Sequence, residues 1–480
     1  MTHRRTGVLV AAATLVAASA VVGADGTTAT AGTTGKPGER RSYTGEIDGA
    51  KYRAEVPENW NGTLLLYSHG YYPAGWSPEK TALTNSEEAE KALLDEGFAL
   101  AASDYKGTYG YAVEDAADDQ IALQDWFAEH VGRPERTIST GQSMGGAVAV
   151  LLGERNPDRF DGVLAMCAEY DGNGTWNTAL DMTYALRTLL VPEADQDIDL
   201  VRPRDPERSA KVLETAVDEA LKSERGRARL ALAGALGNVP GWYSAHEARP
   251  VKVADRVRAQ AQWLRNAYVA GIGPVGRVDL ERRAGGNPST NVGVDYRRQL
   301  AGSAQKELVR KAYREAYREA GAAGSGLSAD VAKLNAGGRI AADAKAVAYM
   351  KRYSVVRGTT PQPVLTLHNA QDGGAVSDQA GWYAGQVARN GDAGNLRQTY
   401  VNRGSHCAFS AADEITALKV LLTKAGTDRW PSTSPRVLNR TVARHEPGLH
   451  QVLDLGTFEK KAMPPAFVPF SPARFPRPTR

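Results

Sequence analysis

The stretch that decides the fold covers residues 136–152 and reads RTISTGQSMGGAVAVLL. Residues 136–140 predict a short strand, and residues 146–152 predict a helix of small and apolar side chains that packs on a sheet. Between them, GQSMG at 141–145 places Ser143 at a sharp strand-to-helix turn. Such a turn exposes the serine hydroxyl, and the small residues around it let the turn close. We therefore expect Ser143 to be a nucleophile; the alternative is an ordinary glycine-rich loop.

Strand and helix patterns alternate on both sides of this stretch. Short, nearly continuous apolar runs are typical of buried parallel strands, which connect through helices. Strands are expected at 63–67, 98–102, 162–166, 363–367 and 397–401, and helices at 85–95, 113–130, 377–388 and 413–424. This order predicts an α/β fold with a parallel sheet covered by helices on both faces.

The alternation stops between about 169 and 360, where helix-forming and charged residues dominate and no buried strand is predicted. We expect a helical insertion at 169–360 that divides one core into residues 42–168 and 361–426. Residues 427–480 form a C-terminal extension. Its last 17 residues hold six prolines, which exclude a regular helix or a central strand. The phenylalanines between these prolines indicate that the tail lies on the body of the protein.

The N-terminus indicates export. Arg4 and Arg5 precede an apolar run at 8–22, followed by small-residue cleavage candidates at 18–20 and 22–24. These features are typical of a signal peptide, here residues 1–24, followed by a flexible linker at 25–41. A membrane anchor is the alternative, but the apolar run is short for a span of about 20 residues. The protein is expected to be secreted, without a stable membrane anchor.

Composition excludes several classes of function. The formal charge is +3, and no basic patch with interleaved aromatic residues stands out, so a nucleic-acid partner is not expected. The chain has two cysteines, and neither has a partner at zinc-ligand spacing. We expect no metal.

A serine hydroxyl needs a general base, which is usually a histidine oriented by a carboxylate. Of the eight histidines, His406 lies in a short loop directly after the last predicted strand. Asp372 follows the strand at 363–367, at the edge of the sheet that faces this loop. Asp378 is a rival for the acid, although it is better placed as a helix cap.

Two further acids, Glu169 and Asp171, follow the strand at 162–166 and are a second alternative for the same role.

An oxyanion hole needs two backbone N–H donors. Met144, after the nucleophile, is one candidate. The other comes from the loop after the strand at 63–67, with Tyr71 first and Gly70 second. His69 in this loop is interpreted as a structural histidine that supports the loop, not as the base.

The chain resembles the α/β-hydrolase superfamily at four places: HGY at 69–71, GQSMGG at 141–146, Asp372 and His406. These places follow one another along the chain in the order that is typical of the superfamily. The resemblance implies a mostly parallel eight-stranded sheet, an acyl-enzyme mechanism and no cofactor. It also implies a helical cap after the sixth strand, which matches the insertion. Within the superfamily, the chain looks most like secreted actinobacterial esterase- and peptidase-like members.

The pair His406-Cys407 is similar to secreted feruloyl esterases and tannases, which also place a cysteine directly after the catalytic histidine. These enzymes have a second cysteine before the serine, where this chain has Gln142. In an exported chain with two cysteines, a Cys167–Cys407 disulfide is expected. Two separate buried thiols are the alternative.

The sequence thus predicts a secreted serine hydrolase that cleaves carboxylic esters, acting on small or short polymeric substrates. A serine peptidase for short peptides and a non-catalytic binding protein that retains the fold are the alternatives.

Overall fold

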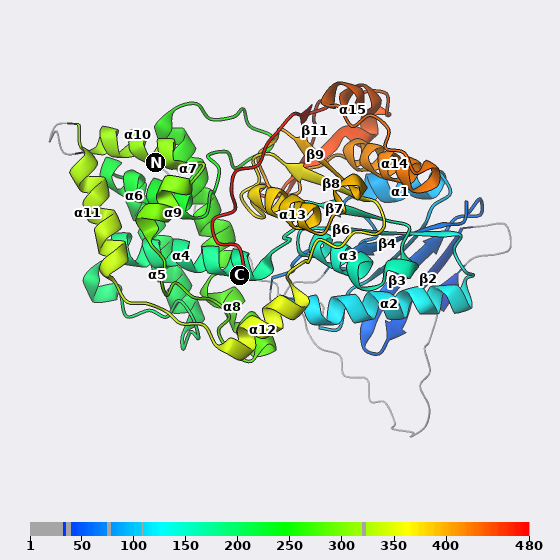
Figure 1. The fold of residues 1–480 in the computed structure, drawn as a ribbon, viewed down its shortest axis with the longest axis horizontal. Coiled ribbons are helices and arrows are strands. Elements are labelled where there is room, and N and C mark those ends of the chain that lie inside the picture. The colour runs from blue at the N-terminus through cyan, green and yellow to red at the C-terminus, as the bar shows by residue number, and fades with distance from the viewer. Residues whose placement is uncertain (1–31, 35–39, 74–77, 108, 319–322, 480) are drawn as a thin grey trace, which may run out of the picture.

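The computed structural model describes residues 32–34, 40–73, 78–107, 109–318 and 323–479 (Figure 1). The predicted signal peptide and most of the linker lie outside the described residues.

The core is a ten-stranded sheet in the order β1-β2-β3-β5-β4-β6-β7-β8-β9-β12. The six strands from β5 to β9 in this order run parallel, while β1, β2 and β3 at one edge and β12 at the other pair antiparallel. The eight strands β2 to β9 correspond to the predicted eight-stranded sheet, and the structure adds one strand at each edge. The strands are β1 Gly32–Thr34, β2 Arg41–Ile47, β3 Ala50–Val56, β4 Thr63–Ser68, β5 Ala99–Ser103, β6 Arg136–Gln142, β7 Gly162–Met166, β8 Val364–Asn369, β9 Leu396–Val401 and β12 Phe467–Val468.

Every residue of β4, β5, β7 and β8 is buried. This explains their continuous apolar sequences, because helices cover both faces of the sheet. Helices α1, α14 and α15 pack on one face, and α2, α3 and α13 pack on the other (Figure 1). These helices are α1 Glu87–Asp95, α2 Val113–His130, α3 Met144–Arg155, α13 Asp378–Arg389, α14 Ala411–Thr427 and α15 Pro435–Val442.

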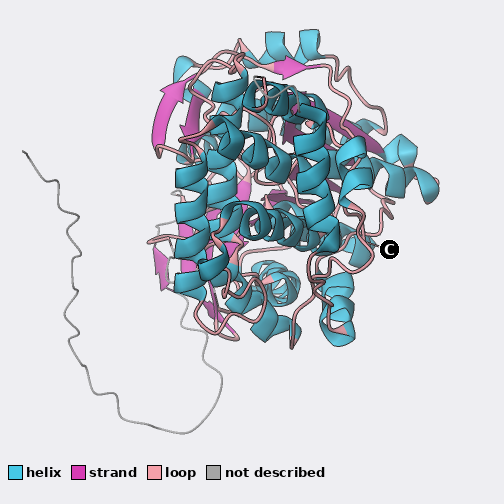
Figure 2. Ribbon diagram, turned by 90° about the vertical axis from the view of Figure 1, so that its left-hand side faces the viewer, coloured by secondary structure: helices cyan, strands magenta, loops and turns pink. Residues whose placement is uncertain are grey.

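The insertion after β7 is helical, as predicted, and β7 is the sixth strand when β2 is counted as the first. Most of its helices share a hydrophobic core of their own at one end of the sheet (Figure 1). Seen from that end, they lie in front of the strands (Figure 2). They are α4 Gly172–Leu190, α5 Pro206–Ala220, α6 Glu224–Leu236, α7 Val253–Trp263, the π-helix η3 Leu264–Gly271, α8 Pro274–Ala284, α9 Tyr296–Gly302, α10 Lys306–Ala316, α11 Ala323–Ala336 and α12 Ala344–Tyr353. We call this insertion the cap.

The C-terminal extension begins with α15 and a hairpin of β10 Gln451–Asp454 and β11 Glu459–Ala462. The proline-rich tail then lies on the body, as predicted. Phe475 is buried, and Arg477 Nη1 lies 2.5 Å from Oδ2 of the buried Asp181 in α4. The tail therefore connects the core to the cap (Figure 1). Within the described residues, we find no helix that is both long and apolar enough to cross a membrane.

Candidate active site

Ser143 occupies the tight turn between β6 and α3. Its φ of 55° and ψ of −128° are unusual for a residue with a side chain, and its N–H donates to the carbonyl oxygen of Met166 at 2.9 Å. A Cβ atom on Gly145 would lie 2.1 Å from the carbonyl oxygen of Ser68, so only glycine lets α3 approach β4 this closely. The glycine-flanked serine is thus held in the strained geometry that the sequence predicts.

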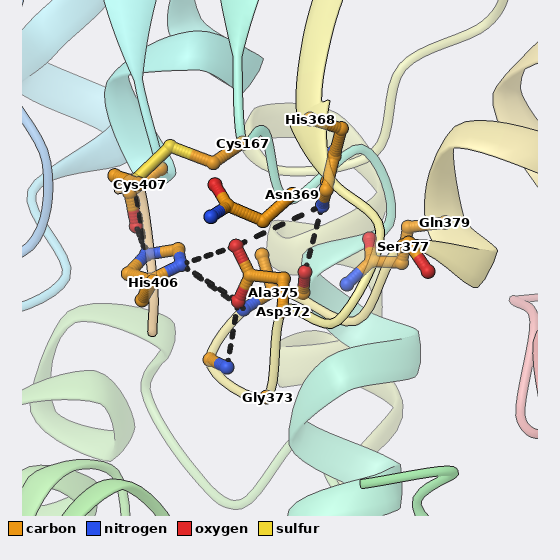
Figure 3. A network of polar contacts seen from close by, with 12 residues as sticks. Cys167, His368, Asn369, Asp372, Gly373, Ala375, Ser377, Gln379, His406 and Cys407 are labelled. Atoms are coloured by element: carbon orange, nitrogen blue, oxygen red, sulfur yellow. Dashed lines mark hydrogen bonds and ion pairs between the residues drawn. A yellow bond between two sulfur atoms is a disulfide. The ribbon is translucent and has the colours of Figure 1, made fainter. Parts of the chain in front are cut away.

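Three side chains meet at the C-terminal edge of the sheet. His406 Nε2 lies 2.8 Å from Ser143 Oγ, and His406 Nδ1 lies 2.9 Å from each carboxylate oxygen of Asp372. Asp372 is buried, and its Oδ1 also accepts the N–H groups of Gly374 and Ala375 at 2.8 and 3.1 Å (Figure 3). A proton on Nδ1 therefore satisfies Asp372, and Nε2 is free to accept the proton of the serine hydroxyl.

The pKa of His406 is raised above its ordinary value of 6.5. Burial opposes a charge on the imidazole, but the carboxylate of Asp372, its hydrogen bond and the charge of Glu169 together outweigh burial. The site thus favours the imidazolium that forms when His406 takes a proton.

The alternative acids have other partners. Asp378, the first residue of α13, accepts from Asn238 Nδ2 at 2.6 Å and from the N–H of Ala473 at 3.0 Å. Asp171 caps α4 and accepts from Thr479 of the tail. These acids anchor the cap and the tail, whereas Asp372 contacts the histidine.

Glu169 is near the site without being the acid. Its Oε2 accepts a hydrogen bond from the hydroxyl of Tyr111 at 3.0 Å. The sequence placed Glu169 among the acids for His406, but both oxygens of Asp372 occupy the Nδ1 side of that ring. Tyr111 was not identified from the sequence, because no motif surrounds it.

The loop after β4 borders the nucleophile. A Cβ atom on Gly70 would lie 3.1 Å from Ser143 Cβ and 3.7 Å from its Oγ. His69 is buried and stacks between Tyr72 and Tyr105 with ring centroids 4.2 and 4.0 Å away, and burial lowers its pKa to about 4. A neutral, stacked His69 supports this loop, in agreement with the structural role expected from the sequence.

Met144 begins α3, where the first N–H groups of the helix have no intrahelical acceptor. Its N–H and that of Tyr71, with Gly70 as the second choice, remain the predicted oxyanion donors.

A disulfide joins Cys167 and Cys407 across 240 positions, with 5.4 Å between their Cα atoms. Cys167 directly follows β7, and Cys407 directly follows His406, so the bond ties the loop of the histidine to the centre of the sheet (Figure 3). Together with His406, these cysteines form the one His/Cys/Asp/Glu cluster of metal-ligand size in the described part of the chain. Because both sulfurs are in the disulfide, neither is a thiolate ligand.

The cap contacts the loops that carry the three residues. The hydroxyl of Tyr268 in η3 donates to the carbonyl oxygen of Gly373 at 2.8 Å, next to Asp372. The hydroxyl of Tyr71 lies 3.5 Å from the carbonyl oxygen of Gly271, at the end of η3. Tyr268 was not identified from the sequence, because one tyrosine in a long helical insertion carries no spacing signal.

No protein-family model matches the chain. It is 28% identical over 436 residues to the o-phthalyl amidase of Xanthobacter agilis, covering 83% of this chain and 91% of the amidase. The two chains are therefore similar over most of their lengths.

Solved structures with weaker similarity include esterases and a peptidase. Feruloyl esterase B from Aspergillus oryzae is 12% identical, with 82% of this chain and 81% of that chain covered and a TM-score of 0.40. The acylaminoacyl peptidase of Pyrococcus horikoshii is also 12% identical, with 77% and 38% covered and a TM-score of 0.34. The strand order and the insertion show an α/β fold: a mostly parallel sheet with a large helical cap after its sixth strand, as the sequence predicts.

Proposed function

We propose that this chain is a serine hydrolase that cleaves carboxylic acyl compounds through an acyl-enzyme intermediate. The observation that carries the proposal is the hydrogen-bonded line from Ser143 Oγ through His406 to the buried carboxylate of Asp372. This arrangement makes a serine hydroxyl nucleophilic.

In the proposed reaction, Ser143 Oγ attacks the substrate carbonyl carbon while His406 Nε2 takes the hydroxyl proton. The N–H groups of Met144 and Tyr71 stabilise the oxyanion that forms. The bond to the leaving group then breaks, and His406 returns its proton to the leaving atom. Water, deprotonated by His406, hydrolyses the resulting ester of Ser143 and restores the enzyme.

The bond that is cleaved is a carboxylic ester or an amide. The sequence favours an ester. Similarity to a protein named o-phthalyl amidase favours an amide of an aromatic acid as the second candidate. Short peptides belong to the same amide class.

We also propose that the protein is secreted after its signal peptide is removed. The charged and apolar N-terminal sequence and the Cys167–Cys407 disulfide support this location. Mass spectrometry of the protein from culture medium should give a mature N-terminus near residue 24, and an intact residue 1 would contradict the proposal.

A substrate panel tests the catalytic proposal. Purified protein should hydrolyse at least one member of a set of p-nitrophenyl esters and p-nitroanilides of aliphatic and aromatic acids, including phthalic acid. Ser143→Ala should abolish this hydrolysis while the circular dichroism spectrum stays unchanged. A folded wild-type protein that hydrolyses none of them and does not react with a fluorophosphonate would instead indicate a binding protein.

A further inference from the structure

Glu169 lies between the nucleophile and the cap. It comes two residues after Cys167 and three residues before α4 begins. Its backbone N–H is 3.4 Å from the carbonyl oxygen of Ser143. The side chain is partly exposed, although its neighbours Ala168 and Tyr170 are buried. Glu169 is therefore a largely enclosed acid that keeps partial exposure, and its backbone lies next to Ser143.

Core and cap together fix this carboxylate. Tyr111, whose hydroxyl donates to Glu169 Oε2, is buried. Its ring packs edge-on against the ring of Trp176 in α4, with the ring centroids 5.6 Å apart. The backbone N–H of Tyr111 donates to Asp279 of α8 at 2.9 Å. A carboxylate held in this way is preorganised to accept a further hydrogen bond.

The second feature of Glu169 is its electrostatic surroundings. Among the described residues, no lysine or arginine forms an ion pair with it. Its pKa is raised to about 7, mainly by burial and also by the negative charge of Asp171. Hydrogen bonds from Thr175 and Tyr111 lower the pKa but do not cancel this effect. His406 lowers this pKa, and Glu169 in turn raises the pKa of His406. Tyr268 also faces this group from the cap, since Asp372 and Glu169 both raise its pKa.

We propose that Glu169 accepts a hydrogen bond from the N–H of the scissile amide and thereby selects amides over esters. This inference rests on the proposed function. Tyr111 donates to Oε2 at 3.0 Å, and each carboxylate oxygen has two acceptor sites, so the carboxylate can accept one more hydrogen bond from the substrate. The leaving atom must lie near His406 Nε2, because this nitrogen returns the proton to it, and in this arrangement the carboxylate of Glu169 has to reach that atom from its position beside the Ser143 backbone. No bond to Glu169 forms: the C–N bond breaks, and the amine leaves with its original hydrogen and the proton from His406.

An ester in the same position would leave one acceptor site of this carboxylate unfilled, although Tyr111 still donates to Oε2, because the leaving oxygen carries no hydrogen. Sites built to bind an N–H group discriminate strongly against analogues that lack it, since a buried polar group then has no partner.

The first test compares a p-nitroanilide and a p-nitrophenyl ester of one acid that the enzyme accepts. Glu169→Gln leaves one uncharged acceptor oxygen, for which Tyr111 competes, and should lower kcat/KM for the anilide by about 10-fold, because a hydrogen bond to a charged group is stronger than one to a neutral group. The same variant should change kcat/KM for the ester by less than about threefold. Equal losses on both substrates would overturn the inference.

The second test uses pH and needs no Glu169 variant. His406 acts on both substrates, so its titration cancels in the anilide-to-ester ratio of kcat/KM. This ratio should rise as Glu169 ionises near its pKa of about 7. Tyr111→Phe removes a hydrogen bond to the carboxylate and should move the rise to higher pH. A flat ratio in the wild type would overturn the inference.

Glu154 provides a matched control. It is another glutamate whose pKa burial raises to about 7, but its carboxylate accepts the N–H groups of Arg357 and Gly358 at the far end of α3. Glu154→Gln should keep both the ratio and its pH profile. If the wild type cleaves neither substrate and Ser143 does not react with a fluorophosphonate, the proposed function and this inference both fail. If Ser143 reacts and the ester is cleaved, but the ratio does not respond to Glu169, only the inference fails.

Discussion

His406 Nε2 lies 2.8 Å from Ser143 Oγ, although 263 positions separate the two residues in the chain. The cap occupies most of that interval, and the sheet brings its two ends together because β6, β7, β8 and β9 are neighbours. The disulfide adds a covalent link from Cys167 on the serine side of the insertion to Cys407 on the histidine side.

The acid is the first residue to test. Asp372→Asn should lower kcat by about 10⁴-fold, because an amide does not fix the tautomer of His406 or stabilise its charged form. Asp378→Asn and Asp171→Asn should be milder in activity, since these acids contact the cap and the tail. Steady-state kinetics on folded variants gives the ranking, and the reverse order would move the acid away from Asp372.

The pH profile follows from the raised pKa of His406. The imidazole must be neutral to take the serine proton, so kcat/KM is lost as the pH falls through its pKa. The acidic limb should therefore lie above the ordinary value of 6.5. In Asp372→Asn the opposing effect of burial dominates, and the limb should move to lower pH. A wild-type limb below 6.5 would contradict the electrostatic account of this site.

The disulfide should matter for both stability and rate. It closes a loop of 240 positions, for which chain entropy gives at most about 5 kcal/mol of stabilisation. It also holds the loop of His406, and displacing a base by about 1 Å can lower the rate by about 10²-fold. Mild reduction should lower activity before the far-ultraviolet circular dichroism changes. Full activity after complete reduction would show that the sheet alone positions His406.

The tail should stabilise the cap through Arg477. Asp181 is fully buried, so Arg477→Ala leaves its charge without a cationic partner and should cost about 3 kcal/mol in the free energy of unfolding. Arg159→Ala removes an exposed pair with Asp125 and should change stability by less than about 1 kcal/mol. Chemical denaturation of both variants measures the difference, and similar values would mean that the tail does not support the cap.

The cap should shape specificity. Substitutions within 169–360 that line the site should change the preference among acyl groups more than the reaction with small acetate esters. Tyr268→Phe is a suitable first variant, because it removes only the hydroxyl that contacts Gly373. Parallel losses on all substrates would identify the cap as a stability element.

The sequence predicted the central sheet well because buried parallel strands and a glycine-flanked serine leave local signals. Helix α2 and strand β7 have the predicted bounds, 113–130 and 162–166. Strands β1 and β12 were not predicted, because each has three residues or fewer, and β2 and β3 were not located, because polar residues interrupt their sequences.

In the site, too, the sequence predicted residues with local signals and missed a contact between distant residues. The positions of Ser143, Asp372 and His406 after strands could be inferred from chain order. The Tyr111–Glu169 contact joins residues 58 positions apart, and the sequence holds no pattern that pairs them.

Covalent labelling tests the central claim, that Ser143 is an activated nucleophile, most directly. Mature protein is treated with a fluorophosphonate, digested, and analysed by mass spectrometry. The account predicts one adduct, on the peptide that contains Ser143, and none on Ser143→Ala. It also predicts that labelling slows by orders of magnitude in His406→Ala. An adduct on another residue, or equal labelling of folded wild type and Ser143→Ala, would contradict the account.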